Sequence, residues 1–236
     1  MIVIALLKRG LISAKNLRFL SQIKPIQSEQ DHCPPYFQLC KEFTDNTDLA
    51  KSLVNSMTVH NDFLSEDEEK SILDEIEPYL KRMRYEFDHW DDAIHGYRET
   101  ERLNWNEANT KTLNRVRSIA FPPNVAQLKF VHILDLDQKG YIKPHIDAVR
   151  FCGDTIAGLS LLTDSVMRLV HDKNKHLYAD VWLKRRSLYI MKDTARFDYT
   201  HEILSNEHSV FKGGKVLKDR RISVICRNEP DPRNKD

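Results

Sequence analysis

The pattern of apolar and polar positions changes near residue 124. Before this point, two stretches repeat apolar residues at helical spacing, over residues 66–83 and 105–120. Ser65 and Glu68 stand where the two partners of a capping box stand, so the first helix is expected to begin there. Pro78 is expected to kink this helix or end it early, and Pro122-Pro123 to stop the second one.

Beyond residue 124, short apolar runs alternate with turn-forming residues. These runs predict eight strands, with a polar turn at 137–140 between the first two. The expected ranges are 125–136, 141–147, 155–162, 165–171, 177–184, 186–191, 201–204 and 220–227. Two helices followed by these strands favour an α+β, mainly β fold, namely a double-stranded β-helix (jelly roll) buttressed by N-terminal helices.

The segments outside this pattern differ in composition. Residues 1–28 are rich in basic residues, Ser and interleaved leucines and poor in acids, which predicts a mitochondrial transit peptide and a location in the mitochondrial matrix. A disordered amphipathic arm is the alternative. Residues 29–58 are polar, with Pro34-Pro35, and are expected to be a linker to a folded domain at 59–228. Residues 229–236 are expected to be a disordered tail.

Composition is that of an ordinary globular protein, with 41% apolar and 30% charged residues. Residues 1–30 hold five basic residues and one acid, whereas the rest of the chain holds 31 basic and 34 acidic residues. No apolar run is long enough to span a membrane. The four cysteines are too far apart in sequence for a zinc or redox motif and are expected to be reduced thiols.

A pair of possible metal ligands follows the first long apolar run. His145 and Asp147 are two residues apart, so their side chains would share one face of an extended strand. An imidazole and a carboxylate are two of the three ligands in the facial triad of non-haem Fe(II) oxygenases. The third ligand must come from another strand, and His201 is the best candidate among the remaining histidines. His132 could hydrogen-bond to a ligand.

The last predicted strand carries arginines on an inward face. Arg221, Ser223, Ile225 and Arg227 would share that face. Buried guanidinium groups need an anionic partner, and a carboxylate matches their geometry. Tyr189 is placed in sequence to add a hydroxyl donor. The alternative is a surface strand with solvated arginines.

These features together resemble the AlkB family of Fe(II)/2-oxoglutarate dioxygenases. The resemblance combines the pair His145-x-Asp147, the later His201, and the two arginines of the last strand. The family's last strand reads Arg-x-Asn-x-Thr-x-Arg, so Ser223 and Ile225 depart from it. The following runs resemble in particular a mitochondrial branch of the family: RYEFDHWDDAIHGYRETE, GYIKPHID, FCGDTIAGLSLL, SVMRLVH, SLYI and RRISVICR.

The resemblance implies a set of cofactors and site residues. Fe(II) would be bound by His145, Asp147 and His201, with 2-oxoglutarate and O2 as co-substrates. The residues implied for 2-oxoglutarate are Tyr189, Arg221, Ile222 (through its backbone), Ser223 and Arg227. Residues 59–228 would then be the dioxygenase domain.

The substrate is open between two classes. Residues 84–104 precede the metal motif where nucleic-acid-demethylating relatives place a lid, and we expect an irregular strand or loop there, with a turn at His95-Gly96. Acids balance the arginines in this segment, which favours a protein substrate, and hence a protein hydroxylase, over nucleic acid. Demethylation of mitochondrial RNA and a non-enzymatic binding module with a residual metal site are the alternatives. The resemblance also implies a role in regulated necrosis and lipid metabolism, and a monomer is expected.

Overall fold

The computed structural model describes residues 33–87 and 93–234, so the transit peptide expected at 1–28 lies outside the described residues. The helices are η1 (Lys41–Asp45), α3 (Thr47–Ser56), α4 (Glu66–Leu80), α5 (Glu107–Ala120), α6 (Asp193–Phe197) and η2 (Pro232–Asn234). The strands are β1 (Phe37–Leu39), β2 (Met57–His60), β3 (Ile94–Arg102), β4 (Val131–His145), β5 (Thr155–Leu161), β6 (Ser165–His171), β7 (Tyr178–Leu183), β8 (Leu188–Lys192), β9 (Tyr199–Ile203), β10 (Val210–Phe211), β11 (Gly214–Lys215) and β12 (Arg221–Arg227).

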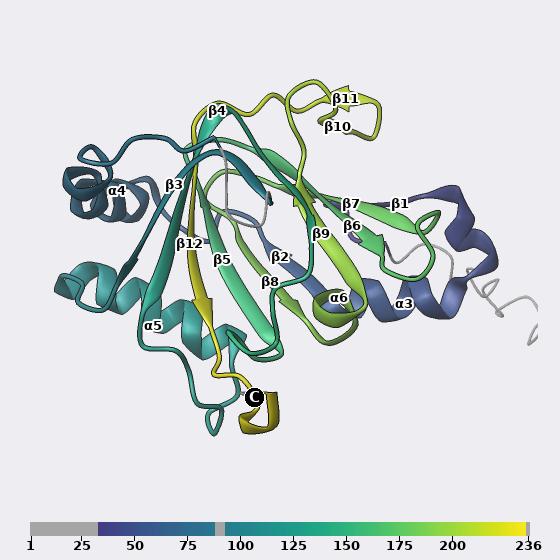
Figure 1. Ribbon diagram of the computed structural model, residues 1–236, viewed down its shortest axis with the longest axis horizontal. Helices are drawn as coiled ribbons and strands as arrows, with labels where there is room; N and C mark the ends of the chain where they lie inside the picture. The colour runs from purple at the N-terminus through teal and green to yellow at the C-terminus, as the bar shows by residue number, and fades with distance from the viewer. Residues whose placement is uncertain (1–32, 88–92, 235–236) are drawn as a thin grey trace, which may run out of the picture. The chain divides into compact units, whose positions relative to one another are not determined.

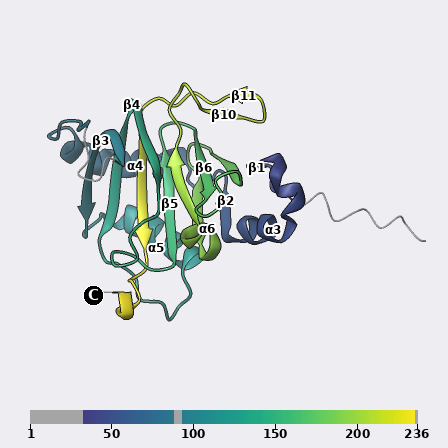
Figure 2. The ribbon, with the colours of Figure 1, turned by 45° about the vertical axis from the view of Figure 1, so that its right-hand side comes forward.

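Ten of these strands form one curled antiparallel sheet (Figure 1). Nine lie in the order β1-β7-β6-β9-β4-β12-β5-β8-β2, and β3 pairs with β4. The small β10–β11 hairpin stands apart from this sheet (Figure 2). The mainly β, jelly-roll class predicted from the sequence is confirmed, because the sheet curls on itself and helices cover part of one face.

Strand β4 joins the two halves of the curled sheet. Its first part, Val131–Leu136, pairs with β3 and β12, whereas Ile142 and His145 pair with β9. The sequence predicted two strands separated by a turn at 137–140, but β4 is continuous. These four polar residues bulge out of β4 opposite a single residue of β3, Gly96, which has φ +66°. A Cβ on Gly140 would lie 2.5 Å from the Gly96 carbonyl oxygen, so the close approach requires glycine.

The two faces of the sheet bury separate cores. Strands β5, β8 and β12 turn Leu159, Leu188 and Val224 toward α4 and α5, and α5 lies against the outer side of β5 (Figure 1). The other face encloses an inner core that includes Met167 and Ile225. Strand alternation produces this division, because successive side chains point to opposite faces.

Helix α4 begins as the sequence predicts. The Ser65 hydroxyl accepts a hydrogen bond from the Glu68 backbone, and the Glu68 carboxylate accepts one from the Ser65 backbone, so the capping box is confirmed. The helix continues through Pro78 for two residues, to Leu80. The second helix, α5, ends at Ala120, ahead of the two prolines.

The linker prediction for residues 29–58 is wrong where the structure describes them. Residues 37–56 form β1, η1 and α3, and β2 begins at Met57. Phe37, Phe43 and Leu53 are buried in the inner core. These apolar side chains are spaced too widely in the sequence to show a period, so their burial could not be predicted from periodicity.

The irregular strand or loop expected at 84–104 is in part a strand. Ile94–Arg102 form the strand β3, whose register with β4 shifts at Gly96, so His95-Gly96 lies within a strand rather than in a turn. Residues 88–92 lie outside the described residues. In the expected tail, Pro232–Asn234 form a short 3-10 helix. No helix in the described part of the chain is long and apolar enough to cross a membrane.

Candidate active site

A cavity of about 290 Å³ opens on the inner face of the curled sheet. Side chains from β3, β4, β5, β6, β8, β9 and β12 line it, together with the loop that follows β4. Seven of the eight site residues expected from the sequence lie on its wall: His145, Asp147, Tyr189, His201, Arg221, Ser223 and Arg227. The eighth, Ile222, turns its side chain to the opposite face and packs in the core beneath the helices.

Three possible metal ligands meet at this cavity. His145 ends β4 and lies directly opposite His201 of β9 in the strand register. Asp147 lies in the loop beyond the strand, not on the extended strand that the spacing argument assumed. Its Oδ1 is 3.3 Å from His145 Nε2 and 3.8 Å from His201 Nε2. One ligand atom from each residue lies within 4.8 Å of the others, a cluster that could hold a metal ion.

The protonation states of this cluster suit a cation. Burial, and then the charge of His145, lowers the pKa of His201 to about 3, so its imidazole is neutral near pH 7. Burial opposes ionisation of Asp147, but the hydrogen bond from His145 and the charges of His201 and Arg227 outweigh it and lower its pKa. His145 Nδ1 lies 2.9 Å from the Lys143 carbonyl oxygen, which orients the ring.

The cavity wall also carries a buried guanidinium. Arg221 is 1% exposed and donates to the Ser223 hydroxyl and, at 3.2 Å, to the Ser160 hydroxyl. Its Nε has no hydrogen-bond partner, and no carboxylate among the described residues pairs with it. Burial raises the pKa of the nearby Tyr189 phenol, which the charges of Arg221 and Arg227 only partly offset, so Tyr189 keeps its proton as a donor. The Arg221 guanidinium on this wall has no anionic partner among the described residues and can bind an anion.

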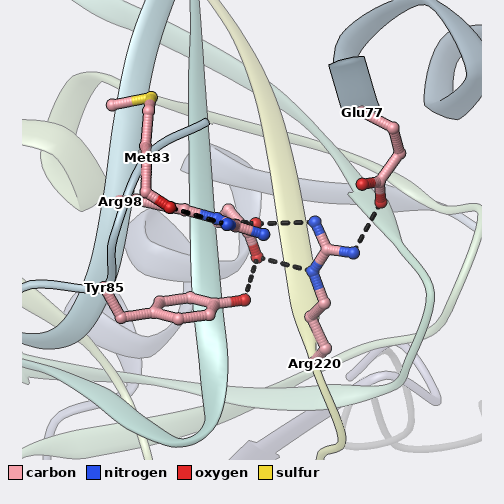
Figure 3. Close-up of polar contacts among 6 residues, drawn as sticks. Glu77, Met83, Tyr85, Arg98 and Arg220 are labelled. Carbon is pink, nitrogen blue, oxygen red and sulfur yellow. Dashed lines mark hydrogen bonds and ion pairs between the residues drawn. The ribbon is translucent and has the colours of Figure 1, made fainter. Parts of the chain in front are cut away.

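The strand that carries Arg221 is anchored on its outer face by a partly buried ion-pair network (Figure 3). Arg220 donates to both carboxylate oxygens of Asp135 on β4, at 2.9 and 2.7 Å, and to Glu77 of α4. Asp135 is fully buried and also accepts hydrogen bonds from Arg98 and Tyr85. Arg220 and Arg221 therefore point to opposite faces of the sheet. Arg220, on the outer face, fixes the start of β12, and Arg221, on the inner face, enters the cavity.

Several residues at the cavity were not singled out from the sequence. Ser160 could have been noticed as one of two hydroxyl residues, with Thr155, in the largely apolar strand 155–162, but its contact with Arg221 depends on strand pairing. Gly158 lies opposite Tyr189 in the register, with the ring directly over it. Cys152, whose Sγ is 3.8 Å from Asp147 Oδ2, receives a hydrogen bond from the buried Arg196. His132, expected near a ligand, instead contacts Glu99 at 2.9 Å on the cavity wall.

Comparison with known proteins points to one family, although no protein-family model matches the chain. The chain is 52% identical over 179 residues to mouse "Alpha-ketoglutarate-dependent dioxygenase alkB homolog 7, mitochondrial", covering 76% of this chain and 81% of that protein. The cattle protein of the same name is 51% identical over 183 residues, covering 78% and 83%. The solved structure of OsALKBH1 superposes with a TM-score of 0.55 at 12% identity, covering 73% of this chain and 97% of that one, which supports the fold.

The comparisons agree with the geometry. Identity above 50% over most of both chains is far beyond what a shared fold requires, and the inner cavity holds a possible metal cluster together with a buried unpaired guanidinium. The chain therefore belongs to the AlkB family of Fe(II)- and 2-oxoglutarate-dependent dioxygenases.

Proposed function

We propose that this dioxygenase hydroxylates a protein side chain in the mitochondrial matrix. Its family fixes the cofactors as Fe(II), 2-oxoglutarate and O2, and the mitochondrial names of its relatives support a mitochondrial location. The substrate class and the matrix compartment are our inference. We further propose residues 1–28 as the transit peptide, in keeping with their basic, acid-poor composition.

His145, Asp147 and His201 would hold the iron. The fit rests on the donor set, because two imidazoles and one carboxylate converge with their ligand atoms within 4.8 Å. Because His201 is neutral and Asp147 is ionised, neither residue has to release a proton before it coordinates a cation. When bound, the iron supplies oxygen activation coupled to decarboxylation of 2-oxoglutarate to succinate and carbon dioxide. Three protein ligands leave positions open for the co-substrates.

Arg221 would pair with the distal carboxylate of 2-oxoglutarate. The observation that carries this proposal is a fully buried guanidinium on the cavity wall with an unpartnered Nε and no acidic partner among the described residues. Tyr189 and Ser223 would add hydroxyl donors, and the Ile222 backbone would lie close to them. Arg227, whose guanidinium is 3.6 Å from Asp147 Oδ2, would lie at the metal end.

The charge around the cavity favours a protein substrate. Nucleic-acid binding draws on clustered positive charge, whereas acidic and basic side chains are mixed along β3 beside the cavity. Demethylation of mitochondrial RNA remains the alternative. The buried guanidinium and the His-Asp-His cluster argue against a binding module without activity. A role in regulated necrosis and lipid metabolism is proposed from the family resemblance alone.

The experiment measures Fe(II) and 2-oxoglutarate binding, by charge-transfer absorption under anaerobic conditions, and then succinate release on adding O2. We expect His145→Ala to lose iron binding. Arg221→Ala should keep iron but bind 2-oxoglutarate at least about 30-fold more weakly, since removing one partner of a buried charge pair costs roughly 2–5 kcal/mol. The exposed His208→Ala and Arg82→Ala variants are matched controls. Wild-type affinity for 2-oxoglutarate in Arg221→Ala would overturn the assignment.

A further inference from the structure

A buried arginine lies close to the metal-ligand cluster without lining the cavity. Arg196 belongs to the short helix α6, which leads into β9, the strand that carries His201. Its side chain is 1% exposed, its Nη1 has no hydrogen-bond partner, and no carboxylate pairs with it among the residues the structure describes. Burying a guanidinium without an anionic partner costs free energy, whereas an apolar side chain would fill the same space without that cost. The position of Arg196 therefore calls for a reason other than packing.

The guanidinium of Arg196 holds the loop that follows β4. Its Nε donates to the Gly153 carbonyl oxygen at 3.2 Å, and its Nη2 donates to Cys152 Sγ at 3.3 Å. Gly153 is also held by the chain beyond β12, because its backbone N–H donates to the Asn228 carbonyl oxygen at 3.0 Å. The Asn228 side chain leaves no room for a Cβ on Gly153. The loop is therefore fixed a few residues after Asp147.

Cys152 connects Arg196 to a metal ligand. Its Sγ lies 3.8 Å from Asp147 Oδ2. A guanidinium can only donate hydrogen bonds and an ionised carboxylate can only accept them, whereas a thiol does both. Cys152 Sγ therefore accepts from Arg196 and directs its S–H at Asp147, so the three groups form one chain of hydrogen bonds.

The two oxygens of the Asp147 carboxylate have different partners. Oδ1 lies 3.3 Å from His145 Nε2 and 3.8 Å from His201 Nε2, the two other ligands of the cluster. Oδ2 instead lies 3.6 Å from Arg227 Nη2 and 3.8 Å from Cys152 Sγ. Because Oδ2 is held in this way, Oδ1 is the oxygen presented to an ion. A single carboxylate oxygen with two imidazoles is the donor set of the facial triad, which keeps positions open for co-substrates.

We propose that Arg196 and Cys152 are positioning residues that hold the Asp147 carboxylate for Fe(II). Neither belongs to the three ligands, and each acts through Asp147. Arg196 also links the two segments that supply ligands, because it precedes His201 in the chain and holds the loop that carries Asp147. This inference rests on the proposed iron ligands and deepens that assignment. Residues that orient a ligand typically contribute about 10- to 100-fold to metal affinity.

The test measures the dissociation constant of Fe(II) by anaerobic titration of the full-length protein. Cys152→Ala should weaken Fe(II) binding about tenfold or more, because Asp147 loses a donor. Cys152→Ser should stay within about threefold of wild type, since a hydroxyl also accepts and donates. Arg196→Met, which removes the guanidinium, should weaken binding as Cys152→Ala does. The double variant should bind no more weakly than the weaker single variant, because both changes break the same chain.

A matched pair of controls lies on the opposite face of the sheet. Cys226 is 2% exposed, as Cys152 is, and hydrogen-bonds to Arg117, but it packs in the core beneath the helices. Cys226→Ala and Arg117→Met therefore remove a buried thiol and a guanidinium without touching Asp147, and both should bind Fe(II) as wild type does. Urea unfolding of each metal-free variant ensures that only folded proteins are compared.

Three outcomes would overturn the proposal: wild-type Fe(II) affinity in folded Cys152→Ala or Arg196→Met, an equal loss in Cys152→Ser, or an equal loss in Cys226→Ala. Should Cys152→Ala not fold, Arg196→Met and Cys152→Ser decide by the same criteria. No Fe(II) binding by wild type would refute the proposed iron ligands. Wild-type binding that His145→Ala abolishes, and that Cys152→Ala and Arg196→Met leave unchanged, would refute only the positioning role.

Discussion

Gly158 is expected to control how tightly 2-oxoglutarate binds through its contact with Tyr189. It lies opposite Tyr189 on the neighbouring strand, and a Cβ added there would be 2.4 Å from two ring carbons and 2.5 Å from the hydroxyl of Tyr189. Carbon atoms in contact are normally about 3.5–4.0 Å apart. In Gly158→Ala the ring must therefore move by about 1 Å or more.

The expected loss of 2-oxoglutarate affinity follows from the displacement of the Tyr189 hydroxyl. A hydrogen bond to a charged group contributes about 1.5–3 kcal/mol, so losing the proposed Tyr189 donor should weaken 2-oxoglutarate roughly 10- to 150-fold. Overpacking should also cost about 1–3 kcal/mol of folding stability. Gly158 does not have a positive φ, so the substitution introduces a steric clash rather than backbone strain.

The assay is calorimetric titration of 2-oxoglutarate into protein loaded with Mn²⁺, which prevents turnover. Tyr189→Phe removes the hydroxyl without a clash, and the double variant should bind no more weakly than the weaker single variant, because both changes remove the same contact. Gly214→Ala, where the nearest atom to a new Cβ is an ordinary 3.5 Å away, is the matched glycine control. A folded Gly158→Ala protein with wild-type affinity would refute this reasoning, as would full additivity with Tyr189→Phe.

Two further predictions concern buried charges. Asp135→Asn should lower the free energy of unfolding, measured in urea, by about 3–5 kcal/mol, because Arg98 and Arg220 lose a buried anionic partner. The control Asp74→Asn, at an exposed position, should change the free energy of unfolding by less than about 0.5 kcal/mol. Equal losses in the two variants would contradict the stabilising role of the ion-pair network. Burial, and then the charge of Arg221, lowers the pKa of Lys218 to about 8, against 10.5 for an ordinary lysine. The unfolded chain then binds more protons between pH 8 and 10.5, so stability should rise across that window relative to Lys218→Met, and parallel pH curves for the two proteins would contradict this.

Local signals in the sequence were sufficient for some elements. The capping box at Ser65 and Glu68 and the helical repeat behind it depend on residues within a few positions of one another. The alternation in β12 likewise predicts which side chains share a face, and Arg221 and Arg227 do line one cavity. Such patterns involve only residues of one helix or strand, so they can be detected without knowing which other elements pack against it.

Features that depend on distant partners could not be predicted in this way. Residues 94–102 are mostly charged and polar because β3 is an edge strand with a half-exposed face, so their composition did not distinguish a strand from a loop. The interruption in β4 uses the same polar residues as a turn, but β4 resumes its pairing with β3 at Tyr141. The contacts of Ser160 with Arg221 and of Gly158 with Tyr189 exist only once separate strands are in register.

The early position of β1 sets a limit on proteolytic maturation. Phe37–Leu39 pair with β7, and Phe37 is buried in the inner core. The folded domain therefore already includes residues that lie only a few positions after Pro34. A processing protease that removes the proposed leader must cut ahead of this point. Expression of a fragment that starts at residue 59 would remove β1 and α3 and leave the edge of β7 and part of the inner core open to water, which favours aggregation.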